Sequence, residues 1–274
     1  MSFKRNVVVI IGVGRMGLAI ARRLGSGCHL VLADSSSVPL EAAAGTLRGE
    51  GHFIEAVHTD VSSLRSVLNL AKHAGTFGPI RIIAYTASLS PMQAPPGRID
   101  PVYLLGPAYV IEAFLPFAST GTSLVVISSL AGHIAKANLS PEFEKHLATA
   151  PVNELLNHAF FNTPIDERVN APGLPAYGIS ERASFLRVQA SAAAWGKKGA
   201  RINSISTPTG HQELEGRYGE YMRGMLANGP AGRMGTDVDI ANAVSFLGSP
   251  EASFITGTDI LLDGGWLASQ TWKE

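Results

Sequence analysis

Three glycines near the N-terminus have the spacing that lets a protein backbone bind a phosphate. Gly12, Gly14 and Gly17 form the pattern G-x-G-x-x-G, with Arg15 and Met16 inside it. Between a strand and a helix, the first glycine allows a tight turn, the second lets the backbone approach a pyrophosphate, and the third permits close helix–strand packing. The free N–H groups of the helix N-terminus attract the anion. We therefore expect these five residues to bind the pyrophosphate of a dinucleotide.

Asp34 stands where such a site needs an acid. It directly follows a second apolar segment, residues 29–33. A carboxylate at this place accepts hydrogen bonds from the adenosine ribose hydroxyls and repels a 2′-phosphate. The three serines that follow supply no positive charge, and only Arg15 favours the phosphate. The sequence therefore predicts NAD as the cofactor, with NADP less favoured.

Alternating strands and helices are needed to position this site. Residues 7–11 are all β-branched, which is typical of a strand buried on both faces. We expect further strands at residues 29–33, 53–57, 80–84 and 123–128, and helices at 18–24, 39–49, 64–73 and 101–117. Strands that alternate with helices in this way predict an α/β fold with a doubly wound parallel sheet.

Composition excludes several classes of partner. The 274 residues fit one large domain, 1–274, and the balance of 22 basic and 22 acidic residues gives no reason to expect nucleic acid or an anionic membrane. No segment reaches the roughly 20 apolar residues of a membrane helix. The single Cys28 fits a reducing compartment, and the histidines lack Cys or Glu at ligand spacing. We expect a cytoplasmic protein without a metal site.

Further motifs along the chain carry a family resemblance. They are Asp60-Val61, Ser128-Ser129-x-x-Gly132, Tyr177-x-x-x-Glu181, Arg201-Ile-Asn203, and the segment from Pro230-Ala-Gly-Arg-Met to Asp263-Gly-Gly265. Together with the glycine turn, and in this order, they resemble a short-chain dehydrogenase/reductase over the whole chain. The resemblance implies a single-domain Rossmann fold with about seven parallel strands flanked by helices, a small-molecule substrate, and a homodimer or homotetramer.

Four more residues are expected at the cofactor. Asp60 and Val61 follow a strand at the carboxyl edge of the sheet, where ligands bind, although Asp60 has the alternative of capping the next helix. Ala87 is the one residue that matches the Asn-Asn-Ala-Gly segment of the family. The family's Pro-Gly turn beside the nicotinamide is missing after Asn203-Ser-Ile-Ser. Either Thr207 takes its place or that pocket is rebuilt.

The catalytic group departs from the family at one position. In the family a tyrosine hydroxyl exchanges a proton with the substrate and a serine hydrogen-bonds the substrate oxygen, and Tyr177 and Ser129 match these residues. The family's lysine, which lowers the pKa of the tyrosine and holds the nicotinamide ribose, is replaced by Glu181. An anion on the same helix face would raise the pKa of the phenol but could still bind the ribose. Alternatively, Glu181 pairs with Arg182 or Arg187 and touches no ligand.

An insertion, residues 133–175, separates the catalytic serine and tyrosine, where typical members have a short loop. Ser140 and Pro141 predict the start of one helix, and an apolar stripe predicts a second helix over residues 151–161. An insertion at this point must rise near the substrate mouth, where it would form an apolar lid. The equal alternative is a packing surface that changes how subunits meet.

These residues predict an NAD(P)-dependent oxidoreductase that transfers hydride between nicotinamide and a hydroxyl or ketone of an apolar substrate. The alternative is a degenerate member that keeps the dinucleotide fold but acts as a non-redox tailoring enzyme or a nucleotide-binding pseudoenzyme. Ser129 and Tyr177 favour hydride transfer. Glu181, the missing Pro-Gly turn, and Tyr103 in place of a proton-relay asparagine favour the alternative.

Overall fold

The computed structural model describes residues 5–88, 101–136, 139–162, 175–208, 224 and 229–272. Within these ranges the strands are β1 (Val7–Ile11), β2 (His29–Asp34), β3 (Phe53–His58), β4 (Ile80–Tyr85), β5 (Ser123–Ser129), β6 (Arg201–Thr207) and β7 (Asp259–Leu261). The helices are α1 (Arg15–Leu24), α2 (Ser37–Gly49), α3 (Leu64–Phe77), α4 (Pro101–Phe114), α5 (Leu130–Ala135), α6 (Pro141–Thr149), α8 (Pro175–Gly196), α10 (Asp237–Gly248) and α11 (Trp266–Thr271). Short 3-10 helices are η1 (Leu115–Phe117), η3 (Ala159–Asn162) and η5 (Pro250–Ala252).

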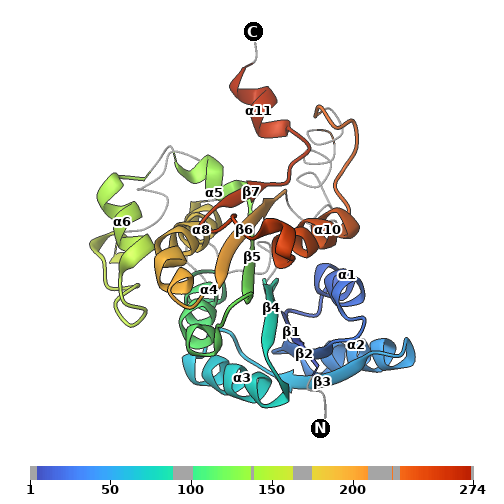
Figure 1. The fold of residues 1–274 in the computed structure, drawn as a ribbon. Coiled ribbons are helices and arrows are strands. Elements are labelled where there is room, and N and C mark those ends of the chain that lie inside the picture. Colours follow the sequence, from blue (N-terminus) through green and yellow to red (C-terminus); the bar gives the residue numbers. More distant parts are fainter. Residues whose placement is uncertain are drawn as a thin grey trace.

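The strands form one sheet in the order β3-β2-β1-β4-β5-β6-β7, and every neighbouring pair is parallel. The chain moves outward from β1 to β3 and then returns to β4 on the other side of β1 (Figure 1). In an open α/β sheet this reversal creates a crevice at the carboxyl ends of the strands, where ligands bind. The predicted doubly wound parallel sheet of about seven strands is confirmed.

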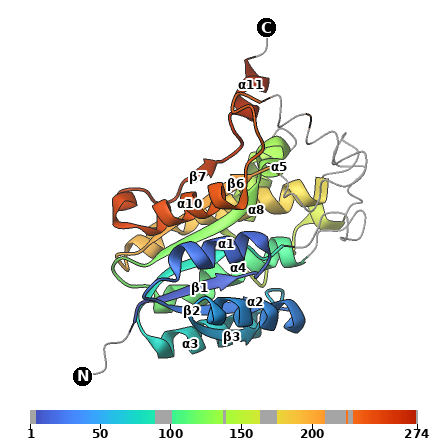
Figure 2. The same ribbon diagram turned by 90° about the vertical axis from the view of Figure 1, so that its right-hand side faces the viewer.

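Both faces of the sheet are covered by helices, because β1 is apolar on both sides. Val7, Val9 and Ile11 belong to the core under α3, α4 and α8, whereas Val8 and Ile10 belong to the core under α1, α2 and α10. Successive strand residues point to opposite faces, so a run of β-branched residues serves both cores. Figures 1 and 2 show these layers, with α11 at the end of the molecule farthest from β3.

The predicted strand boundaries are close to those observed. The first strand agrees at both ends, and the strands expected at 29–33, 53–57, 80–84 and 123–128 each extend one residue further. The helix expected over 101–117 ends at Phe114 and continues as η1, which contains Pro116. α4 itself continues through an interior proline, Pro107, so the change to a 3-10 turn cannot be assigned to Pro116 alone.

The predicted helix over residues 151–161 is wrong. Successive turns and η3 occupy this segment, because the N–H groups of Glu154 and Asn157 donate to carbonyls three residues back, at 2.8 and 2.9 Å. His146 Nε2 lies 3.0 Å from the carbonyl oxygen of Leu155, which is an acceptor that a helix would have used. The first predicted helix of the insertion is confirmed as α6, with the Ser140 hydroxyl capping its N-terminus.

The described part of the insertion packs against α8. Phe143 and Leu147 of α6 share a third apolar core with Leu155 and with residues of α4 and α8. The buried Arg187 guanidinium on α8 donates to the carbonyls of Leu147 and Ala150 at 3.1 and 3.0 Å. These bonds satisfy backbone carbonyl groups at the C-terminal end of α6, which have no hydrogen-bond donor within the helix. The lid and subunit-contact predictions also involve residues 163–174, which lie outside the described residues.

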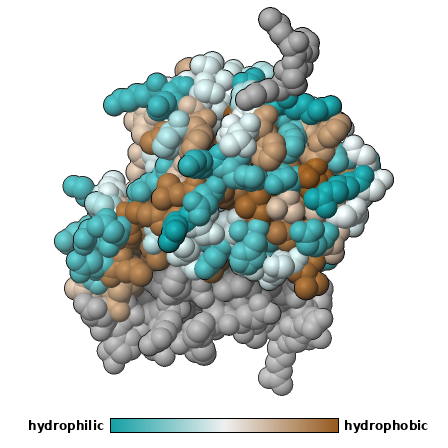
Figure 3. Space-filling model, turned by 90° about the horizontal axis from the view of Figure 1, so that it is seen from below, coloured by the Kyte–Doolittle hydropathy of each residue, from teal (hydrophilic) through white to brown (hydrophobic). Residues whose placement is uncertain are grey.

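β3 is an edge strand, and its surface is interrupted by charge. Figure 3, seen from below, shows apolar and polar side chains interspersed on this side of the molecule. Phe53 on β3 is 49% exposed, and the Arg5 guanidinium lies 3.7 Å from the centre of its ring. Glu55 pairs with His73 of α3 at 2.8 Å. Charged groups along an edge strand oppose its pairing with another chain.

Candidate active site

A cleft of about 520 Å³ opens at the carboxyl ends of the strands on either side of the β1–β4 reversal. Its lining includes nearly all of the residues predicted for the site, namely Gly12, Gly14, Arg15, Met16, Gly17, Asp34, Asp60, Val61, Ala87, Tyr177, Glu181 and Thr207. Ser129 is the predicted site residue that does not line the cleft. Its neighbour Ser128 does. The structure thus brings residues from both ends of the chain to one cleft.

The glycine turn lines one end of the cleft. Gly12 has a φ of +97°, and a Cβ there would lie 2.6 Å from the Ala87 nitrogen and 2.7 Å from Thr86 Oγ1. A Cβ on Gly17 would collide with the carbonyl oxygen of Gly12. At Gly14, by contrast, a Cβ would meet no atom within 4 Å. Packing therefore requires glycine at positions 12 and 17. Gly14 instead leaves open space beside the N-terminus of α1, and this space suits a pyrophosphate.

Thr86 holds this turn in place and was missed by the sequence-based prediction. Its hydroxyl donates to the carbonyls of Gly12 and Ile11 at 2.9 and 3.2 Å, and its N–H donates to Ile11 at 2.7 Å. The side chain is buried between β1 and β4. A polar residue directly after a buried strand, next to the point of sheet reversal, was the signal available in the sequence.

Asp34 is oriented by the backbone around it. Val13 N–H donates to Oδ2 at 3.0 Å and Ser36 N–H donates to Oδ1 at 2.9 Å. Arg15 is the one basic side chain lining the cleft in the part of the chain that the structure describes, and its Nε lies 3.0 Å from Asp237 Oδ2. Arg15, the one residue that favoured binding of a 2′-phosphate, is therefore paired with a carboxylate from the C-terminal part of the chain.

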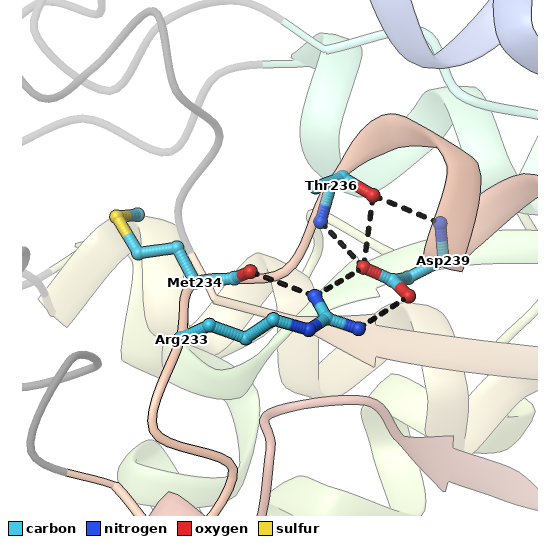
Figure 4. Close-up of polar contacts among 4 residues, drawn as sticks. All are labelled: Arg233, Met234, Thr236 and Asp239. Atoms are coloured by element: carbon cyan, nitrogen blue, oxygen red, sulfur yellow. Dashed lines mark hydrogen bonds and ion pairs between the residues drawn. The ribbon is translucent and has the colours of Figure 1, made fainter.

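The start of α10 places Asp237 at the cleft. Figure 4 shows the polar contacts that fix this start. Thr236 caps the helix, with its hydroxyl accepting from the Asp239 N–H while the Asp239 carboxylate accepts from the Thr236 N–H. Arg233 donates to both Asp239 oxygens at 2.7 and 2.8 Å and to the carbonyl of Met234 at 2.9 Å. The Arg233 guanidinium and the Thr236 bonds hold the pKa of the Asp239 carboxyl well below its usual range.

Tyr177 and Glu181 of α8 form the other end of the cleft with Ser128 of β5. Ser128 Oγ donates to Glu181 Oε2 at 2.9 Å and to the Glu181 carbonyl at 3.0 Å, and both residues are buried. The Tyr177 ring packs edge-on against Tyr103, with 5.1 Å between ring centres. Glu181 thus occupies the wall of the cleft beside Tyr177, as expected for a residue four positions along the same helix face.

The two arginines proposed as partners for Glu181 have other carboxylates. Arg182 pairs with Glu144 of α6 at 2.6 Å, and Arg187 lies 3.9 Å from Glu112 of α4. Both guanidinium groups point toward the helices packed on α8. Glu181 itself is buried and lines the cleft.

Ser128 was missed because two adjacent serines end β5. Neighbouring strand residues face opposite sides, so only one of the two can face Glu181. The Ser129 hydroxyl instead accepts from the Ala131 N–H at 3.2 Å and caps α5. Gly132 lies where α5 crosses α8, because a Cβ there would lie 2.8 Å from the Arg182 nitrogen.

Other polar groups lie apart from the cleft. His133, which follows the serine motif, pairs with Asp259 at 2.8 Å and stacks on Phe185. In the described residues, no group of three His, Cys, Asp or Glu side chains could hold a metal ion. No described helix combines the length and apolar character needed to cross a membrane.

Known proteins match this chain over most of its length. A family model described as short chain dehydrogenase matches residues 6–141, and one described as Enoyl-(Acyl carrier protein) reductase matches residues 159–267. A short-chain dehydrogenase/reductase of Alternaria brassicicola is 34% identical over 269 residues, 96% of each chain. A 3-alpha-hydroxysteroid dehydrogenase/carbonyl reductase of Comamonas testosteroni is 33% identical over 187 residues, 65% of this chain and 69% of that protein.

Solved structures share the fold at lower identity. A blue fluorescent protein from a metagenomic library, in complex with NADPH, matches with a TM-score of 0.71 and 19% identity over 95% of this chain and 97% of its own. A dehydrogenase/reductase from Sinorhizobium meliloti 1021 matches with a TM-score of 0.72 and 19% identity over 97% and 96% of the two chains. At this identity the similarity concerns the fold alone.

The glycine turn can be tested with two alanine substitutions. Gly17→Ala should lower the free energy of unfolding by about 1–3 kcal/mol, because the methyl group collides with the Gly12 carbonyl. Gly14→Ala should change the melting temperature little and weaken NADH binding by about tenfold or more, because its methyl group enters the open space. Thermal unfolding and NADH fluorescence titration measure the two effects. Unchanged NADH affinity in Gly14→Ala would contradict this placement of the pyrophosphate.

The start of α10 should show a pH-dependent stability. Asp239→Asn is expected to cost about 1 kcal/mol at neutral pH, because a capping carboxylate and its ion pair are lost. The depressed pKa of Asp239 means that its contribution is complete above the unfolded pKa of about 4 and disappears as the pH falls toward the folded pKa. Melting curves of the two proteins should therefore converge as the pH is lowered. Glu41→Gln, at a largely exposed side chain, serves as control.

Proposed function

This chain belongs to the short-chain dehydrogenase/reductase family, and from this membership we propose that it is an NAD-dependent oxidoreductase acting on a hydroxyl or carbonyl group. One observation carries the proposal: a single cleft joins the glycine turn and Asp34 at one end to Tyr177 and Glu181 at the other. A dinucleotide needs both ends, the first for its adenosine and pyrophosphate and the second for its nicotinamide.

The residues at the first end fit NAD. The glycine turn and the α1 N-terminus would bind the pyrophosphate, and Asp34 would accept hydrogen bonds from the adenosine ribose. Its backbone bonds from Val13 and Ser36 keep the carboxylate at the cleft. A 2′-phosphate would meet this carboxylate, and Arg15 is already paired with Asp237. These charges support NAD over NADP.

The residues at the second end support proton and hydride exchange with a substrate. When bound, the nicotinamide supplies or accepts the hydride. Tyr177 would give a proton to the substrate oxygen or take it back. The part predicted for Ser129 is not included, because its hydroxyl caps α5 and it does not line the cleft. Glu181, oriented by Ser128, would accept hydrogen bonds from the nicotinamide ribose. Glu181 therefore keeps one of the tasks of the family's lysine.

The substrate is proposed to be apolar, and the protein to work as a cytoplasmic homodimer or homotetramer. One relative is named for hydroxysteroids and carbonyl compounds. Val102, Ile127 and the ring of Tyr177 line the cleft near Glu181 and give this end an apolar character. An apolar alcohol or ketone fits such surroundings.

Cofactor choice depends on Asp34. Asp34→Asn should weaken NADH binding and narrow the preference for NADH over NADPH by about tenfold, because the repulsion of the 2′-phosphate is removed. Parallel titrations with NADH and NADPH measure the preference. Tighter binding of NADPH than of NADH by the wild type would reverse the assignment.

Activity depends on Tyr177. With NADH and a panel of bulky apolar ketones, Tyr177→Phe should lower the rate of NADH oxidation by about 10²–10⁴-fold, because the proton donor is lost. NADH affinity should change little, and Tyr109→Phe, a matched change outside the cleft lining, should leave the rate unchanged. If the wild type binds NADH but exchanges hydride with no ketone or alcohol tested, the degenerate, non-redox alternative becomes the better description.

A further inference from the structure

Three charged residues from different elements meet at the end of the cleft that the glycine turn lines. Asp34 is the last residue of β2, Arg15 is the first of α1, and Asp237 is the first of α10. Asp34 lies beside the glycine turn, because Val13 N–H donates to its Oδ2 at 3.0 Å. Arg15 follows Val13 by two residues, so its long side chain starts close to the carboxylate proposed to bind the adenosine ribose. A 2′-phosphate on that ribose would lie in the range of a free guanidinium.

The Arg15 guanidinium is bound by Asp237. Arg15 Nε lies 3.0 Å from Asp237 Oδ2. α1 and α10 pack against each other on the same face of the sheet, so the core already holds the two helix starts together (Figures 1 and 2). A cation that is matched by a carboxylate at this distance exerts little net attraction on a second anion. Asp237 thus cancels the one positive charge in the described lining of the cleft.

The start of α10 does not need Asp237 for its cap. Thr236 and Asp239 form the capping box, and Arg233 pairs with Asp239. The Asp237 carboxylate, at the first position of the helix, is therefore available to Arg15. The two carboxylates of this helical turn thus have separate tasks, one at the cap and one at the cleft.

The ion pair lies partly in water. The Arg15 side chain is 53% exposed and that of Asp237 is 24% exposed. Such a pair adds little to the stability of a fold, because water screens both charges. A phosphate, in contrast, binds an unpaired guanidinium through charge-assisted hydrogen bonds. Loss of the Asp237 charge should therefore change the choice of cofactor more than it changes the stability of the protein.

On these grounds, and resting on the function proposed above, we propose that Asp237 is a specificity-determining residue that withholds Arg15 from the 2′-phosphate of NADP. Asp34 rejects this phosphate by direct repulsion, whereas Asp237 acts through the guanidinium. The preference for NAD is thus divided between the second strand and a helix near the end of the chain. The cleft contains a latent NADP site, and one carboxylate keeps it from being used.

The test compares NADH with NADPH, which differ only in the 2′-phosphate. Dissociation constants are measured by fluorescence titration for the wild type, Asp237→Asn and the double variant Asp237→Asn/Arg15→Gln. We expect Asp237→Asn to strengthen NADPH binding relative to NADH by about fivefold or more, because Arg15 is released. The double variant should return the ratio of the two constants close to its wild-type value. As a matched control, Glu50→Gln removes the carboxylate partner of Arg22, another arginine of α1 that does not line the cleft, and should leave the ratio unchanged.

The outcomes separate this inference from the proposed function. If the wild type binds neither dinucleotide, the proposed function fails and this inference fails with it. If the wild type prefers NADH but Asp237→Asn leaves the ratio unchanged, or the gain persists in the double variant, the role of Asp237 is overturned while the proposed function stands. Circular dichroism and thermal unfolding show whether each variant is folded. Should Asp237→Asn not fold, Asp237→Ser removes the same charge with a residue that suits helix N-termini, and the same shift is expected.

Discussion

The close approach of α1 to the end of β1 is the constraint on which the cleft depends. The Gly12 carbonyl lies where a side chain on Gly17 would have to be, and the same carbonyl accepts from the Thr86 hydroxyl. One peptide group thus ties together β1, α1 and the residue that follows β4. Because β1 and β4 flank the reversal of the sheet, this junction lies in the lining of the cleft.

Sequence patterns predicted the fold well because the central strands are buried on both faces. Such strands need continuous apolar runs, and the runs in β1, β2 and β4 are too short for a buried helix and too apolar for a loop. The segment at 151–161 shows the opposite case. Its apolar spacing is helical, but tertiary contacts decided its backbone, since His146 lies within hydrogen-bonding distance of the Leu155 carbonyl. The periodicity of residues 151–161 carries no information about a hydrogen bond from His146, which lies outside that segment.

The candidate site was predictable where function resides in the backbone and less so where it resides in side-chain orientation. The glycine turn and Asp34 follow from spacing alone. Which serine of β5 faces α8 depends on the pleat of the strand, so Ser128 emerged only from the structure. Glu181 could be noticed as a departure, but its burial beside Ser128 depends on the packing of α8 against β5, which joins residues 53 positions apart.

The bond between Arg15 and Asp237 joins residues 222 positions apart. During synthesis, the glycine turn leaves the ribosome early, whereas the wall that α10 provides arrives only with the last part of the chain. Domains generally fold as units as they emerge. A nascent N-terminal half would therefore carry the glycine turn before Asp237 is available to pair with Arg15.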